Sequence, residues 1–305
     1  MTPTSIPTAN PDQGSIMRYR TFGTTGWELS AIGLGGVPLS FGNRPSESAA
    51  IDVILHALGC GINVIDTADA YCRDESEIGH NERLIAKALA TLSAGERREV
   101  KVFTKGGYTR PGGSWQPNGR PEYVRSACEQ SLGALGIDTI DLYQHHTPDP
   151  EVPVADTIGE MSRLREEGKI RHLGVSNYSV AELDEALAIV EIQAVQNQYS
   201  PRHREPEQDG TLAATAERNV AFIPWSPLGG MDGAKTLDRG LTVLREIADN
   251  WGVSPHRVAL AWLLAKGEHV FPIPGASRRE TIEDSALAAD LDLSADEVER
   301  LDESL

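Results

Sequence analysis

Four side chains that can hold or transfer protons lie at, or just beyond, the ends of short apolar runs. Asp66 ends the run GINVID, Lys105 ends VKVFTK, His146 ends TIDLYQHH, and Tyr71 follows Asp66 by five residues. A free tyrosine has a pKa of about 10, and a neighbouring ammonium stabilises the phenolate and lowers that pKa. We therefore predict that Tyr71 donates a proton with the help of the Lys105 ammonium.

The other two side chains complete a site that could polarise a carbonyl group. Asp66 would hold Lys105 charged and oriented, and the His146 ring would donate a hydrogen bond that places a substrate oxygen beside the phenol. Taken singly, each residue also has a structural interpretation, as a rim ion pair or as a packed ring. The combination favours chemistry, whereas His145 is assigned to packing.

These side chains need a scaffold that brings strand ends together. Apolar runs rich in β-branched residues alternate with longer amphipathic segments, which is typical of parallel β/α units. We count eight such runs, each ending in polar or small residues: 29–36, 61–66, 100–105, 139–146, 170–177, 192–200, 220–226 and 270–277.

The segments between the runs have helical periodicity and recognisable ends. One apolar stripe ends at Gly59 and another at Gly136, Ser179 begins a capping box with Glu182, and Ser254 precedes a proline. The stripes are Ile51, Ile54, Leu55 and Leu58, and Val124, Cys128, Leu132 and Leu135.

Eight strand–helix units in 305 residues predict a single (β/α)8 barrel, with its reactive residues at the carboxyl ends of the strands. The rival is a doubly wound sheet, which would show a GxGxxG turn that opens a helix after the first strand. Gly33, Gly35 and Gly36 run instead into Val37 and Pro38. We expect residues 17–305 to form the barrel and residues 1–16, which have little apolar content, to be a disordered tail.

The composition excludes several classes of protein. The chain has 28 Lys and Arg against 45 Asp and Glu, a net charge of −17 that repels nucleic acid and anionic membranes. Cys60, Cys72 and Cys128 form no CxxC pair, so neither a disulfide framework nor a metal site is predicted. No apolar run reaches the roughly 18 residues of a membrane span, and no signal peptide is recognisable. We expect a cytoplasmic protein without nucleic-acid, membrane or metal partners.

Several ordered motifs resemble those of the aldo-keto reductase family from about Arg18 to about Ala289. Carried over residue by residue, the resemblance implies the catalytic set Asp66, Tyr71, Lys105 and His146. In this family the histidine stands five residues after the aspartate of DLYxxH, which selects His146 over His145. The motifs are DTADAY (66–71), FTKGG (103–107), DLYQHHTPD (141–149), GVSNYS (174–179), PWSPLGG (224–230) and IPGAS (273–277).

The resemblance also implies a nicotinamide cofactor. Trp225 would stack on the nicotinamide and fix which ring face is open. Arg278 and Arg279 suit a 2′-phosphate, which favours NADPH over NADH, although Thr281 departs from the usual arginine. The remaining implied cofactor contacts are Ser176, Asn177 and Gln196 at the carboxamide, Ser226, Pro227, Leu228 and Gly229 over the pyrophosphate, and Gly275, Ser277 and Asp284 at the end of the last run and after it.

The expected activity is hydride transfer between NADP(H) and an aldehyde or ketone, or the reverse oxidation of an alcohol or sugar hydroxyl, with Tyr71 as proton donor. Two alternatives remain open at this point. The chain could be a cofactor-binding accessory subunit of the same fold, or a lyase or aldolase that uses Lys105 as a Schiff base. The sequence predicts neither the particular substrate nor the oligomeric state.

Overall fold

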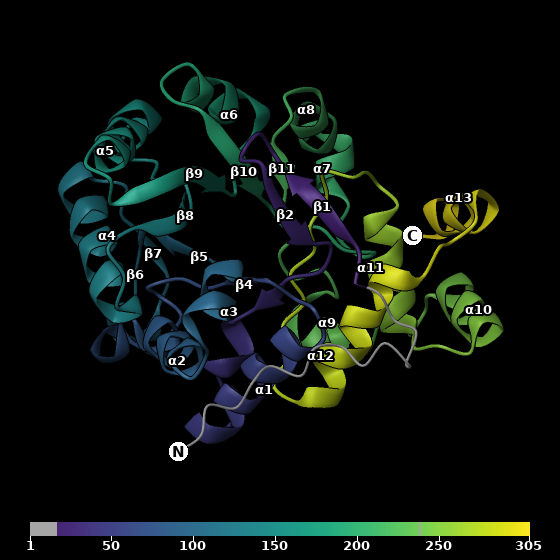
Figure 1. Cartoon of the computed structure of the whole chain (residues 1–305). Coiled ribbons are helices and arrows are strands. Elements are labelled where there is room, and N and C mark those ends of the chain that lie inside the picture. The colour runs from purple at the N-terminus through teal and green to yellow at the C-terminus, as the bar shows by residue number, and fades with distance from the viewer. Residues whose placement is uncertain (1–16, 238) are drawn as a thin grey trace.

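Seven parallel strands form one curled sheet in the computed structural model, which describes residues 17–237 and 239–305 (Figure 1). The expected tail, residues 1–16, lies outside the described residues. Neighbouring strands follow the order β11, β10, β9, β8, β5, β4, β3, and helices surround the sheet, as the (β/α)8 prediction requires. The strands are β3 (Leu34–Gly35), β4 (Val64–Asp66), β5 (Lys101–Gly106), β8 (Ile140–His145), β9 (Ile170–Ser176), β10 (Ile192–Gln196) and β11 (Ala221–Phe222).

The run 270–277, predicted as the eighth strand, closes the ring without forming a regular strand. The Gly33 and Gly35 N–H groups donate to the carbonyls of Pro272 and Pro274 at 2.9 and 3.0 Å, and Phe271 N–H donates to β11 on the other side. Because proline has no N–H, neither proline donates a hydrogen bond in return. The hydrogen bonds from Gly33 and Gly35 therefore run in one direction across this seam, from β3 to the two prolines.

The first predicted run is divided in the structure. Its beginning belongs to an antiparallel hairpin of β1 (Tyr19–Phe22) and β2 (Trp27–Ser30), which the sequence analysis did not predict and which lies across one end of the barrel (Figure 1). The Phe22 ring lies 5.1 Å from the rings of Phe103 and Phe271. Full burial of such a side chain contributes about 1.5–3 kcal/mol, so the hairpin stabilises the barrel interior.

The helices begin and end where the sequence signals indicated. The α1 stripe ends at Gly59, α4 ends at Gly136 in the left-handed conformation, and the Ser179–Glu182 capping box is formed. The helices are α1 (Glu47–Gly59), α2 (His80–Leu89), α3 (Ala94–Glu99), α4 (Pro121–Leu135), α5 (Val154–Glu166), α6 (Val180–Leu187), α7 (Glu205–Gln208), α8 (Thr211–Glu217), α9 (Gly230–Ala234), α10 (Thr242–Trp251), α11 (Pro255–Leu264), α12 (Arg279–Ala286) and α13 (Ala295–Ser304).

Short elements in the loops at the carboxyl ends of the strands shape the entrance to the barrel. They are η1 (Val37–Leu39), η2 (Glu75–Glu77), η3 (Pro111–Gly113), β6 (Tyr108–Thr109) and β7 (Gln116–Pro117), with η4 (Leu287–Asp290) near the C-terminus. Within the described residues, no helix is both long and apolar enough to cross a membrane.

Candidate active site

A cleft of about 790 Å³ opens at the carboxyl ends of the strands. Asp66, Tyr71 and His146 line it next to the buried Lys105, and we call this part its inner end. Ser277 and Arg278 line it at the start of the segment that leads into α12, and we call this part its other end. Parallel strands with right-handed crossovers place such an opening at this face of a barrel, and a volume of this size is typical of ligand sites. The residues selected from the strand ends are therefore brought to one cavity.

Lys105 joins two of the predicted catalytic side chains at the inner end of this cleft. Its Nζ atom donates to Asp66 Oδ1 at 2.5 Å, to the Thr67 carbonyl at 2.9 Å and to the Tyr71 hydroxyl oxygen at 3.1 Å. The lysine side chain is 0% exposed and that of the aspartate 1%. A buried ammonium with three acceptors is fixed in position, so the phenol oxygen has a fixed cationic neighbour.

The electrostatics of this pair only partly match the sequence prediction. Burial lowers the pKa of Lys105, but Asp66 and Tyr71 more than offset this effect, so that its pKa lies above the ordinary value. Burial raises the pKa of Tyr71, and the Lys105 ammonium opposes that rise without cancelling it. The predicted direction of the lysine effect is thus present, whereas the net pKa of Tyr71 is raised. Tyr71 accordingly holds its proton at neutral pH.

His146, rather than His145, lines the cleft. Its ring centroid lies 5.7 Å from that of Tyr71, and its Nδ1 atom is buried without a hydrogen-bond partner. Burial, reinforced by the Lys105 charge, lowers the pKa of His146 well below its ordinary value, so the ring is neutral. His145 instead contacts the Tyr178 hydroxyl through Nδ1 at 2.8 Å and packs outside the cleft, as assigned from the sequence.

Two glutamines hold the second oxygen of Asp66. Gln196 Nε2 donates to Asp66 Oδ2 at 2.8 Å and Gln144 Nε2 donates to the same atom at 3.2 Å. Gln196 was predicted as a cofactor contact, and it lines the cleft while its Nε2 donates both to the aspartate and to Gln144 Oε1 at 3.2 Å. Gln144 was not predicted from the sequence. A glutamine within the apolar strand DLYQHH could have indicated it, because a buried amide needs a hydrogen-bond partner.

Asn177 and Trp225 both line the cleft and are held together by a hydrogen bond. Trp225 Nε1 donates to Asn177 Oδ1 at 3.0 Å, and Asn177 Nδ2 donates to the His146 carbonyl at 3.0 Å. Asn177 has a positive φ of 61°, which is uncommon outside glycine and indicates that the surrounding contacts fix the loop after β9. The neighbouring Ser176 hydroxyl donates to the Gln196 carbonyl at 2.8 Å. These side chains form one rigid wall beside Tyr71 and His146.

An aromatic wall that the sequence analysis did not assemble faces the catalytic side chains. Phe41, Tyr108 and Trp115 line the cleft, and the His146 ring lies 4.8 Å from Tyr108 and 5.8 Å from Trp115. Arg110 packs against two of these rings, with its Cζ atom 3.9 Å from the Trp115 ring centroid and 5.0 Å from that of Phe41. The rings come from two loops: Phe41 follows η1, whereas Tyr108 and Trp115 lie between β5 and α4. No periodic pattern in the sequence links them.

Most of the predicted cofactor residues line the cleft, but three of them do not. The structure does not bring three of them to the wall: Gly229 does not line it, Arg279 pairs with Asp52 on α1, and Asp284 pairs with Arg257 at 2.7 Å. The predicted contacts that do line the cleft here are Ser226, Pro227, Leu228, Gly275, Ser277 and Arg278. Thr281, which stands where the family usually has an arginine, also lines it.

This arrangement defines a class of protein. A protonated phenol, a buried ammonium and a neutral imidazole surround one corner of a cleft at the mouth of a (β/α)8 barrel. The model of the aldo/keto reductase family matches residues 31–305, and the chain belongs to this family. Its members are oxidoreductases that act on carbonyl compounds and sugars and generally use NAD(P)H.

Particular relatives agree with that assignment. The chain is 33% identical to probable aldo-keto reductase 1 of Glycine max over 93% of this chain and 87% of the relative. The thermostable aldo-keto reductase Tm1743, solved with the inhibitor epalrestat, is 31% identical with a TM-score of 0.81, over 94% and 99% of the two chains. The holo form of aldo-keto reductase AKR11C1 from Bacillus halodurans is 26% identical with a TM-score of 0.76, over 94% and 96%.

Proposed function

We propose that this protein reduces an aldehyde or ketone with NADPH and that Tyr71 supplies the proton. The observation that carries the proposal is the Lys105 ammonium, which contacts both Asp66 and the Tyr71 hydroxyl at the inner end of the cleft. Family membership and the relative solved in its holo form support a nicotinamide cofactor.

The chain offers a binding surface for both ends of such a cofactor. The indole of Trp225, tied to Asn177, presents a flat surface beside Tyr71 and His146. At the other end, Arg278 is the N-cap of α12 and no side chain caps the helix, so that the first N–H groups of α12 remain available for an anion. Trp225 would hold the nicotinamide ring, and Arg278 with Ser277 would hold the 2′-phosphate.

When bound, the reduced cofactor supplies a hydride to the carbonyl carbon. The Tyr71 hydroxyl gives its proton to the carbonyl oxygen, so that the product is an alcohol and the enzyme is left with a phenolate. The Lys105 ammonium stabilises that phenolate because its charge lies 3.1 Å away. Neutral His146 donates a hydrogen bond to the same carbonyl oxygen and orients it toward Tyr71.

The residues also bear on the two alternatives. A Schiff base requires a neutral amine, whereas the pKa of Lys105 is raised by its ion pair with Asp66, which argues against a lyase or aldolase. An accessory subunit would need the cofactor-binding surface but not the proton donor. Multiple turnovers in the presence of a simple aldehyde therefore separate a reductase from an accessory subunit.

The test is a panel of aromatic aldehydes, aliphatic aldehydes, ketones and sugars, followed in both directions with NADPH and NADH. We expect turnover with NADPH, and faster reduction of substrates with an aromatic or apolar group next to the carbonyl, since Phe41 and Trp115 line the cleft. Stoichiometric binding of NADPH without turnover of any substrate would contradict the proposal.

Arg278 and Arg279 provide a matched pair that tests the choice of cofactor. Arg278→Ala should weaken NADPH binding by about 1.5–3 kcal/mol and leave NADH binding nearly unchanged, because only NADPH carries the extra phosphate. Arg279→Ala should affect both cofactors equally little, since Arg279 pairs with Asp52. Fluorescence titration of both variants checks this, and equal losses for the two cofactors in Arg278→Ala would contradict the contact.

A further inference from the structure

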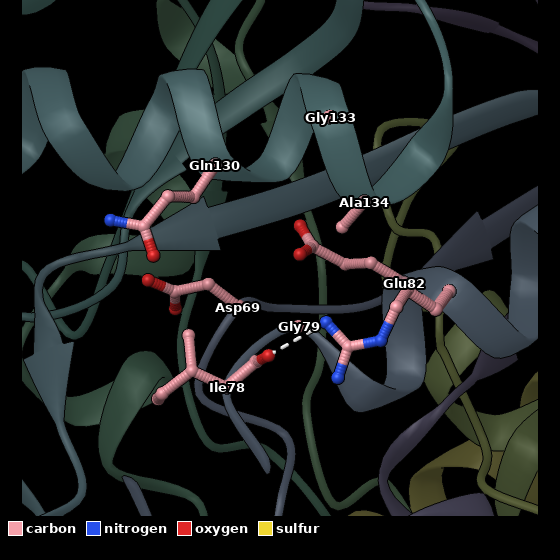
Figure 2. A pocket seen from close by; sticks show the side chains of 8 residues that line it. Asp69, Ile78, Gly79, Glu82, Gln130, Gly133 and Ala134 are labelled. Atoms are coloured by element: carbon pink, nitrogen blue, oxygen red, sulfur yellow. Dashed lines mark hydrogen bonds between the residues drawn. The ribbon is translucent and has the colours of Figure 1, made fainter. Parts of the chain in front are cut away.

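A second cavity of about 320 Å³ lies outside the barrel, between α2 and α4 (Figure 2). Asp69, on the loop between Asp66 and Tyr71, forms part of its wall, together with Glu82 on α2 and Gln130 on α4. None of the described residues lines both this cavity and the catalytic cleft. It is therefore a separate cavity behind the catalytic loop.

Glu82 is a buried acid with an unused oxygen in this cavity. Its side chain is 1% exposed, and Oε1 accepts a hydrogen bond from the Thr104 hydroxyl at 2.6 Å. Its Oε2 atom is buried and has no hydrogen-bond partner, and the buried Ser131 hydroxyl has none either. Burial raises the pKa of Glu82 above its ordinary value. Such an oxygen costs free energy unless a donor reaches it.

Asp69 is a second buried acid without a cationic partner. Its Oδ1 atom accepts the Ala70 N–H at 2.5 Å, and it forms no ion pair with any residue that the structure describes. Burial and the charge of Glu82 raise the pKa of Asp69 well above its ordinary value, although Lys105 opposes the rise. Arg83, the cation in the cavity wall, donates to the Ile78 carbonyl at 2.9 Å and pairs with neither acid.

The remaining polar group in the wall also accepts. Gln130 Nε2 donates to Ser126 Oγ at 3.0 Å, and Figure 2 shows its amide oxygen turned toward Asp69, while the Glu82 carboxyl is directed toward Ala134. The cavity thus presents two carboxyls and an amide oxygen, with the carbon atoms of Ile78 and Ala134 beside them. A complementary ligand carries N–H donors, a positive charge and a small apolar part.

We propose that this cavity is a binding site for a small organic cation, such as an alkylguanidinium or alkylammonium group, held by Asp69 and Glu82. The cation supplies the donors that Glu82 Oε2 lacks and the ion-pair partner that neither acid has among the described residues. A bare metal ion fits less well, because hard divalent cations require about six oxygen ligands and the cavity is larger than one ion.

Methylguanidinium is the probe, and its uncharged analogue N-methylurea is the matched control ligand. Isothermal titration of the intact protein should give one saturable site for methylguanidinium and none for N-methylurea. Glu82→Gln and Asp69→Asn should each weaken binding by roughly tenfold or more. Glu122→Gln makes the same chemical change on exposed α4 surface outside the cavity and should leave binding unchanged.

Gly133→Leu tests the cavity without touching either acid. Gly133 lies within α4 in the cavity wall, and a Cβ atom there would meet no atom within 4 Å. The leucine side chain should fill the cavity and abolish binding, while the melting temperature stays equal or rises because glycine is unfavourable in a helix. This variant keeps the test informative if an acid variant fails to fold.

The proposal is overturned by any of three results. The first is absence of saturable methylguanidinium binding to the unmodified protein. The second is equal binding of N-methylurea, or unchanged binding in folded Glu82→Gln and Gly133→Leu. The third is displacement of the probe by Mg²⁺ or Ca²⁺ at lower concentration than methylguanidinium itself needs, which would identify a metal site.

Discussion

Asp66 and Asp69 lie three residues apart in one loop, and each is 1% exposed, yet their surroundings differ. Asp66 faces the barrel mouth, where it pairs with Lys105 and accepts hydrogen bonds from Gln144 and Gln196. Asp69 lines the cavity outside the barrel, where the charge of Glu82, another acid, raises its pKa. Burial alone therefore does not define a buried acid, because its partners decide whether the charge is stabilised or suppressed.

Tyr71→Phe should have the largest effect on catalysis, because Tyr71 lies on the side of the loop that faces the barrel mouth. Removal of the hydroxyl from the mouth should lower kcat for carbonyl reduction by about 10²- to 10⁴-fold, since proton transfer by a positioned group is worth that much. Cofactor affinity should hold, because the ring still packs. Glu82→Gln, on the outer side, is the control and should keep kcat within about twofold. A Tyr71→Phe variant with full kcat in a chemistry-limited assay would remove Tyr71 from the mechanism.

Lys105→Met removes the partner that distinguishes Asp66 from Asp69. Loss of one member of a buried ion pair should cost about 3–5 kcal/mol of unfolding free energy, and the double variant Asp66→Asn with Lys105→Met should recover much of that loss. Denaturant unfolding of the single and double variants measures both effects. If the single variant were as stable as the unmodified protein, the ion pair would not determine the state of Asp66.

The same variant has a consequence for the pH dependence of alcohol oxidation. Oxidation needs the Tyr71 phenolate as base, and Lys105 lowers the pKa of Tyr71 against the effect of burial. Without the ammonium that pKa rises further, so the rising limb of kcat/KM for oxidation should move to higher pH, with partial recovery in alkaline buffer. A limb that stays in place in a folded, active variant would contradict the coupling.

Glu82→Gln should produce the smallest effect, a change in stability at alkaline pH. The sign of this change tests whether the acid at the outer cavity has a raised pKa. The pKa of Glu82 is raised in the folded protein, so its contribution to stability is fully present below the unfolded pKa and is lost as pH rises through the folded pKa. The amide does not titrate. The variant should therefore match the unmodified protein at acid pH and exceed it by about 1 kcal/mol at alkaline pH. Melting curves across pH measure this difference, and parallel curves would contradict the raised pKa.

The pairing of Asp66 with Lys105 at the barrel mouth was predictable from the sequence, whereas the buried acids Asp69 and Glu82 at the outer cavity were not. Asp66 and Lys105 end apolar runs, and the carboxyl ends of parallel strands must meet, so their proximity followed from strand order. Asp69 lies in a turn whose direction no periodic pattern specifies, and Glu82 looks like an ordinary polar position on a helix. Their burial depends on how α2 and α4 pack against the loop.

The fold shows the same division. The alternation of runs and helices predicted the barrel, but the run 270–277 was treated as an ordinary strand although two prolines remove its donors toward β3. The prediction of the cofactor residues agreed with the structure at some positions and not at others for a related reason. Arg278 and Arg279 are adjacent and chemically alike, and only the start of α12 decides that one lines the cleft while the other pairs with Asp52.

The proline-containing seam has a consequence for the order in which the molecule assembles. Gly33 and Pro272 come from opposite ends of the chain, so their contact closes the longest loop in the barrel, and the two prolines return no hydrogen bond across it. We expect this joint to form last during refolding and to open first in native exchange. Pulse-labelled amide exchange should show the Gly33 and Gly35 amides gaining protection after those at the β5–β8 joint. The barrel would then refold as an open sheet that becomes a cylinder only in its final step.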